Sequence, residues 1–200
     1  MLSARERRDL LQYARDTLTA YFEGGAPPPP PTLEDPSAHA GAFVTLEVDG
    51  DLRGCIGYPG SSQPLGKVVA ECAVAAATGD PRFTPLRRRE MDALEIEISV
   101  LTPIVPVQDV SEIEVGRDGL VVTDGKRRGL LLPQVAVEHG WDRDTFLAHT
   151  CMKAGLRGDA WKAGARILRF QAEVFSESSE RASVSAQEHR GDESGRAPRS

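Results

Sequence analysis

The stretch FVTLEVDGDLRGCIG, residues 43–57, carries the clearest secondary-structure pattern of the chain. Apolar and polar residues alternate in it on both sides of Asp49 and Gly50, a pair that suits the positive φ angles of a tight hairpin turn. The pattern therefore predicts a β-hairpin with strands over 43–48 and 52–56.

The cysteine of this hairpin is the main candidate for chemistry. Because side chains alternate between the two faces of a strand, Arg53 and Cys55 are expected on one face and Leu52 on the other. A neighbouring cation favours the thiolate, and an arginine binds carboxylates and phosphates. Gly54 and Gly57 let a ligand approach the backbone closely. We therefore predict a catalytic Cys55, with the arginine and the two glycines as ligand-binding residues; the alternative is a small buried packing cysteine.

The rest of the chain alternates between helical and strand patterns. Helices are predicted over about 5–21 and 64–78, and a strand over 94–101, where apolar residues alternate with Glu95 and Glu97. The elements predicted after these are a second hairpin (120–123 and 129–132), two helical segments (133–139 and 143–154) and a closing strand (165–175).

The two hairpins share a motif. Residues 49–54 and residues 124–129 both read Asp-Gly-x-x-Arg-Gly, and each hairpin leads into helix and then strand. The repeat predicts an internal duplication within an α+β fold, a two-lobed single domain with a mostly antiparallel sheet. Leu130 stands where the first copy has Cys55, so the shared arginine and glycine are in part architectural and the cysteine distinguishes the first copy.

Three polar residues of the second copy complete the predicted site. On the helix over 143–154, His149 and Cys151 are about 200° apart around the axis, so both cannot face one site. His149 is the preferred general base, with a structural histidine as the alternative, and Cys151 is expected in the core. Gln134 and Glu138 lie four residues apart on the preceding helix, where they can form the polar wall of a ligand-binding cleft between the lobes.

The segment between the second helix and the strand over 94–101 contains Asp80-Pro81-Arg82. A local pairing of the carboxylate with the guanidinium is expected to stabilise this turn. A structural role is therefore the expected one.

The amino-acid composition limits the classes of protein to which this chain can belong. The 200 residues are 40% hydrophobic, enough for a substantial core, and their formal net charge of −6 weighs against nucleic-acid binding, which relies on phosphate neutralisation. No stretch approaches the roughly 20 apolar residues of a membrane span, and no apolar core follows the charged N-terminus as in a signal peptide, so a cytoplasmic protein is expected. The 3 cysteines form no close pair, which fits a reducing compartment. The 4 histidines show no metal-ligand spacing, so no metal is predicted and no cofactor is assigned.

The C-terminal part of the chain changes composition. Residues 177–200 are rich in Ser, Glu, Arg and Gly and poor in apolar side chains, so they cannot bury enough surface to offset their ordering entropy. We predict a domain over 1–176 followed by a disordered polar tail.

Five segments together resemble the AMMECR domain family, in particular its stand-alone prokaryotic form, protein A of the AmmeMemoRadiSam system. They are LRGCIG (52–57), DPRF (80–83), LEIEISVL (94–101), GLLLPQVA (129–136) and HTCMKAGL (149–156). The likeness covers roughly 5–175, and it implies a two-lobed α+β fold with an internal repeat.

The resemblance also implies a function of unsettled chemistry. The name of the system implies a Memo-like protein and a radical SAM enzyme as partners; this chain lacks the Cys-x-x-x-Cys-x-x-Cys motif of the latter. The implied role is to act with these partners through a cleft around Arg53 and Cys55 that binds or modifies a small anionic ligand or a partner side chain. The alternative is a non-catalytic adaptor in which the strand over 52–57 is structural.

Overall fold

The protein folds into two compact units. The computed structural model describes residues 1–34 and 41–183. Unit 1 contains the described residues of 1–34, 41–99 and 174–183, and unit 2 contains 100–173. Both units combine helices with antiparallel strands, so the predicted α+β class and the two lobes are confirmed.

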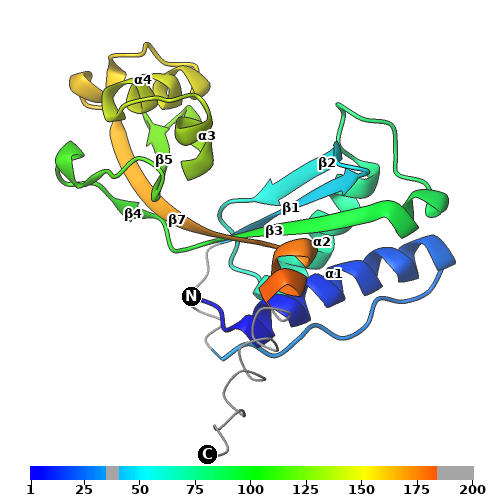
Figure 1. The fold of residues 1–200 in the computed structure, drawn as a ribbon. Helices are drawn as coiled ribbons and strands as arrows, with labels where there is room; N and C mark the ends of the chain where they lie inside the picture. The colour runs from blue at the N-terminus through cyan, green and yellow to red at the C-terminus, as the bar shows by residue number, and fades with distance from the viewer. Residues whose placement is uncertain (35–40, 184–200) are drawn as a thin grey trace, which may run out of the picture. The chain divides into compact units, whose positions relative to one another are not determined.

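Unit 1 is a sheet with helices packed against it. Its strands follow the order β2-β1-β3, and β1 pairs with β2 in antiparallel register. Figure 1 shows α1 and α2 on the same side of these strands. The elements of unit 1 are α1 (Ala4–Glu23), β1 (Gly41–Val48), β2 (Asp51–Tyr58), α2 (Leu65–Thr78), a 3₁₀ helix (Arg88–Ala93) and β3 (Leu94–Leu101), whose last two residues belong to unit 2.

The core of unit 1 follows from the apolar stripes of these elements. Helix α1 begins with a reciprocal capping box between Ser3 and Glu6, which satisfies backbone N–H groups at the helix start. Cys72 of α2 is fully buried and its thiol contacts the carbonyl of Ala42, as expected of a packing cysteine. The other fully buried side chains of this core include Leu10, Leu18, Val44, Leu46, Ile96 and Ile98.

The first hairpin contains a β-bulge that its sequence pattern does not reveal. Asp49 and Gly50 have φ of 54° and 85°, as predicted for the turn. The register then shifts, because Leu46 pairs with Gly54 whereas Glu47 pairs with Leu52, which leaves one extra residue in β2.

The bulge corrects the predicted orientation of Leu52. Residues directly opposite each other in a sheet project from the same face. Cys55 is opposite Thr45, and Leu52 is opposite Glu47, two residues further along β1. Leu52 therefore lies on the same face as Cys55, and its predicted position on the other face is wrong.

Unit 2 is built on a set of antiparallel strands. Strand β5 pairs with β6 and with β7, and β4 pairs with β7, in each case antiparallel. The helices pack on the sheet around a core formed by Ile113, Leu120, Ala136, Phe146 and Leu147. The elements are β4 (Val105–Pro106), a 3₁₀ helix (Val110–Glu112), β5 (Asp118–Thr123), β6 (Arg128–Leu131), α3 (Pro133–Glu138), α4 (Arg143–Lys153), a 3₁₀ helix (Ala160–Ala163) and β7 (Arg166–Ser176), whose last three residues belong to unit 1.

The two hairpins are similar in one contact and different in their turns. A Cβ atom added to Gly54 would lie 2.1 Å from the carbonyl oxygen of Ala76, and one added to Gly129 would lie 2.3 Å from the backbone nitrogen of Ala154. Each glycine thus lets its hairpin approach the end of a helix. The first hairpin has a two-residue loop, whereas the second has a four-residue loop over 124–127. The internal duplication stays a prediction.

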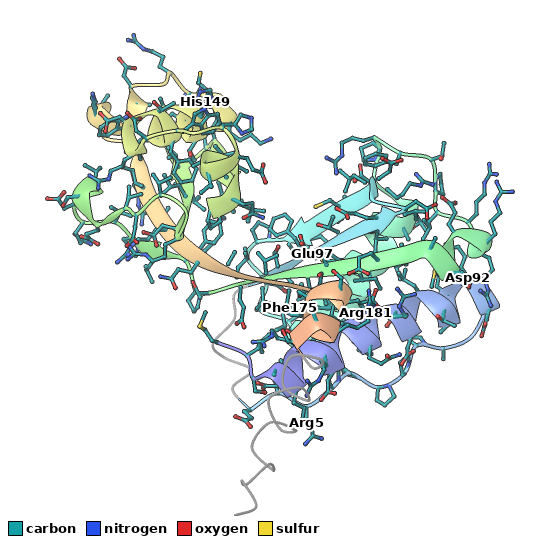
Figure 2. The ribbon with its side chains drawn as sticks, viewed as in Figure 1. Arg5, Asp92, Glu97, His149, Phe175 and Arg181 are labelled. Carbon is teal, nitrogen blue, oxygen red and sulfur yellow. The ribbon has the colours of Figure 1, made fainter. Side chains whose placement is uncertain are left out.

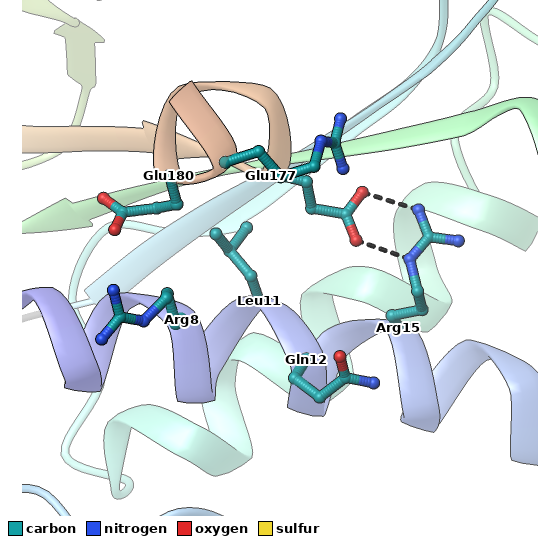
Figure 3. A pocket seen from close by; sticks show the side chains of 7 residues that line it. Arg8, Leu11, Gln12, Arg15, Glu177 and Glu180 are labelled. Carbon is teal, nitrogen blue, oxygen red and sulfur yellow. Dashed lines mark hydrogen bonds and ion pairs between the residues drawn. The ribbon is translucent and has the colours of Figure 1, made fainter. Parts of the chain in front are cut away.

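The residues directly after β7 are helical. The segment 177–183 was predicted to be part of a disordered tail, but the structure describes it as a helix. Glu177 forms a bidentate ion pair with Arg15 of α1, at 2.5 and 2.6 Å, and accepts the N–H of Ile96. Figure 3 shows this pair beside an open pocket of about 660 Å³. Long-range ionic contacts order these residues, and amino-acid composition does not reveal such contacts. The rest of the predicted tail, 184–200, lies outside the described residues.

Within the described ranges 1–34 and 41–183, every helix is too short or too polar to cross a membrane.

Candidate functional site

Cys55 lies on the face of the unit 1 sheet that α2 does not cover. Its neighbour Gly54 points toward α2, and Cys55 points the opposite way. The thiol is free and partly exposed, whereas Cys72 and Cys151 are fully buried. The Thr45 hydroxyl, directly opposite on β1, donates to Cys55 Sγ at 3.4 Å.

Asp80 and Arg82 both form hydrogen bonds with the backbone of Cys55. The N–H of Cys55 donates to Asp80 Oδ2 at 2.9 Å, and Arg82 Nη2 donates to the Cys55 carbonyl at 3.4 Å. The two side chains are joined to each other, since Arg82 Nε and Nη2 donate to the Asp80 carboxylate at 3.0 and 2.7 Å. The predicted local pairing is present, and it also holds the candidate thiol in place.

The two partners of this clamp differ in exposure. The Asp80 side chain is 2% exposed, and its hydrogen bonds from Arg82 and from the Cys55 N–H hold the pKa of that carboxyl well below its usual value. The Arg82 side chain is 56% exposed, and its pKa is raised, chiefly by Asp80 and further by the charge that Cys55 carries when ionised. Asp80 is therefore an anchor, and Arg82 presents its charge to solvent.

Arg82 retains hydrogen-bonding capacity for a ligand. Its Nε and Nη2 are used by Asp80 and Cys55, whereas none of the residues in 1–34 and 41–183 accepts a hydrogen bond from its Nη1. The guanidinium also lies 5.2 Å from the centre of the Phe83 ring, which restrains its plane. The arrangement offers a fixed cation beside a partly exposed thiol.

Arg53, the cation that the sequence pattern indicates, is already paired. Its Nε and its Nη2 both lie 3.0 Å from Glu90 Oε1, and the side chains of Arg53 and Glu90 are 19% and 20% exposed. The pair holds the pKa of Glu90 below its usual value. The binding role of Arg53 therefore stays a prediction for a residue whose charge is balanced inside unit 1.

The two glycines of the predicted site have packing roles. Gly54 lets β2 approach α2, and a Cβ atom added to Gly57 would lie 2.2 Å from the ring of Phe43. Both positions therefore require glycine whether or not a ligand binds. Their predicted ligand contacts remain untested.

Carboxylates lie on the same open face. Glu97 of β3 projects opposite to the buried Ile96 and Ile98, and Figure 2 labels it within unit 1. Burial raises the pKa of Glu97, and the neighbouring Glu47 and Glu95 add to the shift. The open face thus combines a thiol, an arginine and carboxylates that repel one another.

The remaining predicted residues belong to unit 2. His149 of α4, labelled in Figure 2, stacks on Trp141, with ring centres 3.9 Å apart and planes inclined by 6°. The ring of His139 lies 4.7 Å from that of Trp141. Gln134 is partly buried on α3, and Glu138 is exposed. The structure therefore assembles Cys55 with residues of its own unit, and the roles of these three stay predictions.

Among residues 1–34 and 41–183, no group of three or more His, Cys, Asp or Glu side chains lies close enough together to hold a metal ion. The group of this site that suits a small anionic molecule is the Arg82 guanidinium.

Sequence reasoning assigned no part in the site to two of its residues. Thr45 lies opposite Cys55, a pairing that the register of a hairpin with strands over 43–48 and 52–56 indicates. Arg82 is predicted only as the partner of Asp80, because spacing along the chain does not show that the segment between α2 and β3 returns to Cys55.

Comparisons with known proteins agree on one family. Residues 11–175 match the family AMMECR1. A protein of Thermofilum pendens is 46% identical over 92% of this chain and 95% of its own length, and one of Methanothermobacter thermautotrophicus is 47% identical over 88% and 96%. The crystal structure of an uncharacterized protein from Pyrococcus horikoshii superposes with a TM-score of 0.78 at 40% identity, covering 90% of this chain and 95% of that one.

Proposed function

Because this chain belongs to the AMMECR1 family, we propose for it a family function centred on Cys55, in which the thiol face of unit 1 binds a small anionic molecule or an acidic partner side chain. The observation that carries the proposal is the clamp of Asp80 and Arg82 on the Cys55 backbone. It leaves an exposed guanidinium, with Nη1 available, beside a partly exposed thiol.

The anion-binding group in this proposal is Arg82. A guanidinium binds a carboxylate or a phosphate through parallel N–H donors, and it does so best when its plane is fixed. Asp80 fixes the plane of Arg82 through two hydrogen bonds. Arg53 plays a supporting part, since its ion pair with Glu90 stabilises the bulged strand that positions Cys55.

Alkylation with two reagents tests the proposal. Iodoacetate and iodoacetamide both transfer a carbon to the thiolate: the S–C bond forms, the C–I bond breaks, iodide leaves and the thiol proton passes to solvent. They differ in that iodoacetate carries a carboxylate. We expect wild-type protein to react at one cysteine, with Arg82→Gln lowering the ratio of the iodoacetate rate to the iodoacetamide rate about two- to fivefold, the effect of an exposed charge pair.

The controls isolate the site. Cys55→Ala is expected to abolish labelling, because Cys72 and Cys151 are fully buried and burial raises the pKa of Cys72 to about 11. Arg82→Lys retains the charge and is expected to retain most of the preference for iodoacetate. Thermal unfolding by circular dichroism checks that each variant is folded. An unreactive wild-type Cys55, or an unchanged ratio in folded Arg82→Gln, contradicts the proposal.

The family resemblance supports a proposal for partners and location. We infer that a Memo-like protein and a radical SAM enzyme act with this chain, in the cytoplasm, where a reducing environment keeps Cys55 as a free thiol. Biolayer interferometry with the purified proteins tests the partnership. Binding of neither protein would contradict it.

The second candidate function is a non-catalytic adaptor. It is favoured by the structural roles of Arg53, Gly54 and Gly57, and by Leu52, which is 39% exposed on the open face. In this case Cys55→Ala keeps full affinity for the Memo-like or radical SAM partner, while Leu52→Asp weakens it. The reverse result favours the thiol site.

A further inference from the structure

Unit 2 contains a pocket whose charged side chains are all basic. The pocket has a volume of about 410 Å³, within the range of small-molecule sites. It is lined by Ile104, Val121, Thr123, Gly125, Lys126, Arg127, Arg128, Arg166 and Leu168. The absence of an acidic side chain from this lining contrasts with the net charge of −6 of the whole chain.

Strand register brings two of these arginines together. Thr123 of β5 is directly opposite Arg128 of β6 on one side and Arg166 of β7 on the other. Directly opposed residues share a face of the sheet, so both arginines project from the same face, about 10 Å apart at the backbone across two strand spacings. Long guanidinium side chains from such positions can converge on one ligand.

Among the residues that the structure describes, three of the four cationic side chains of the pocket have no ion-pair partner. Arg127 is used inside the hairpin loop, where it pairs with Asp124 at 2.9 Å and donates to the carbonyl of Gly155. In the part of the chain that the structure describes, Lys126, Arg128 and Arg166 take part in no ion pair. By contrast, several arginines outside the pocket each have a carboxylate partner: Arg15, Arg53, Arg82, Arg117, Arg157 and Arg169.

The rest of the lining is apolar. Val121 and Leu168 oppose each other two residues further along the same two strands, and they share their face of the sheet with Thr123. Ile104 adds to this wall. A ligand that fits such a lining has a doubly charged anionic group for the three cations and an apolar body for the wall.

We propose that this pocket binds an organic phosphate, with Arg128 and Arg166 holding the phosphoryl oxygens and Lys126 supplying further charge. Paired guanidinium groups suit the dianion of a phosphate monoester, because each offers parallel N–H donors to two oxygens. The site lies wholly within unit 2 and does not depend on the proposed role of Cys55, which lies in unit 1.

Isothermal titration calorimetry with phenyl phosphate as the probe tests the proposal. Phenyl phosphate carries both the dianion and an apolar ring, and inorganic phosphate carries the anion alone. We expect phenyl phosphate to bind more tightly than inorganic phosphate. Arg128→Gln and Arg166→Gln are each expected to weaken its binding about tenfold or more, the effect of losing a charge-assisted hydrogen bond.

The matched control removes the same charge elsewhere in unit 2. Arg157→Gln alters an exposed arginine that pairs with Asp159 and does not line the pocket, so it is expected to leave the affinity unchanged. Arg128 and Arg166 are exposed, so their variants are expected to unfold at the wild-type temperature. Cys55→Ala is expected to bind phenyl phosphate normally, which separates this site from the thiol site.

Three outcomes overturn the proposal. One is the absence of phenyl phosphate binding to the wild-type protein. Another is an equal loss of affinity in Arg157→Gln and Arg128→Gln, which indicates general charge attraction. The third is tighter binding of a single-stranded DNA oligonucleotide than of phenyl phosphate at physiological salt, abolished by Arg128→Gln, which assigns the pocket to a polyanion instead.

Discussion

Arg53 and Glu90 form an ion pair between the bulge of β2 and the 3₁₀ helix that precedes β3, with Nε and Nη2 of the arginine both 3.0 Å from one carboxylate oxygen. The residues are 37 positions apart in the chain. The pair therefore ties the strand of the candidate thiol to a distant segment of unit 1. The sequence pattern predicts Arg53 as the cation beside the thiol. In the structure Arg53 is held in this ion pair, and Arg82 is the cation that contacts Cys55.

Substitution of Arg53 is expected to affect stability and not anion preference. Arg53→Gln leaves the partly buried Glu90 carboxylate without its cation, so the free energy of unfolding should fall by about 1–3 kcal/mol in urea titrations. The rate ratio of iodoacetate to iodoacetamide should stay at the wild-type value. A fall in that ratio as large as the one in Arg82→Gln would show that Arg53 also attracts the ligand.

Substitution of Gly54 is expected to disrupt the packing of β2 on α2. The Cβ atom of Gly54→Ala would lie 2.1 Å from the carbonyl oxygen of Ala76, so the backbone must move, at a cost of about 1–3 kcal/mol. Gly60→Ala is the matched control, since an added Cβ there meets no atom within 4 Å. Urea denaturation of the two variants measures the difference, and equal stability would contradict the close packing.

Stability is expected to fall in acid through Asp80. Its pKa lies below the ordinary value of 3.8 in the folded protein, so the unfolded state binds more protons as the pH falls. The stabilisation is complete above pH 3.8 and is lost as the pH falls from there toward the folded-state pKa. Asp80→Asn lacks it at every pH, so the difference in unfolding free energy between wild type and Asp80→Asn should shrink below about pH 4.

Asp159→Asn is the control for this measurement. Its carboxylate is 58% exposed and pairs with the exposed Arg157, so solvent screens the interaction and little pH-dependent stability should be lost. A constant difference between wild type and Asp80→Asn across pH 3–6 would contradict the role assigned to the Asp80 carboxylate.

The helical segment 177–183 is expected to resist proteolysis as long as Glu177 holds it. Glu177→Gln weakens the bidentate pair with Arg15, so trypsin should cleave after Arg181 faster than in the wild-type protein. Glu138→Gln, a change at an exposed carboxylate of α3, should leave the cleavage rate unchanged. Mass spectrometry of timed digests identifies the cut.

Much of the fold could be predicted from local patterns. The strand over 94–101 is found at its predicted residues, because its period-two alternation has no competing interpretation. Helix α2 differs from its prediction by one residue, since Pro64 marks its start and Gly79 its end. Both hairpins follow from their Asp-Gly turns.

The candidate site was harder to predict, because its contacts join residues that are distant in sequence. A bulge changes which face a side chain occupies, and no composition rule reports it. Arg53 pairs with Glu90, and the N–H of Cys55 donates to Asp80. Both partners come from segments whose paths depend on tertiary packing. Two parts of the site follow from the sequence: the position of Thr45, through the register of the hairpin, and the local pairing of Asp80 with Arg82.

The clamp on Cys55 has a consequence for solubility. Strand β2 ends the strand order of unit 1, so its outer N–H and C=O groups form a template on which another chain can add a strand. Asp80 accepts the N–H of Cys55 and Arg82 donates to its carbonyl, as a neighbouring strand would. The pair that positions the thiol thus also closes the sheet edge at this residue, and its loss exposes the protein to edge-to-edge aggregation.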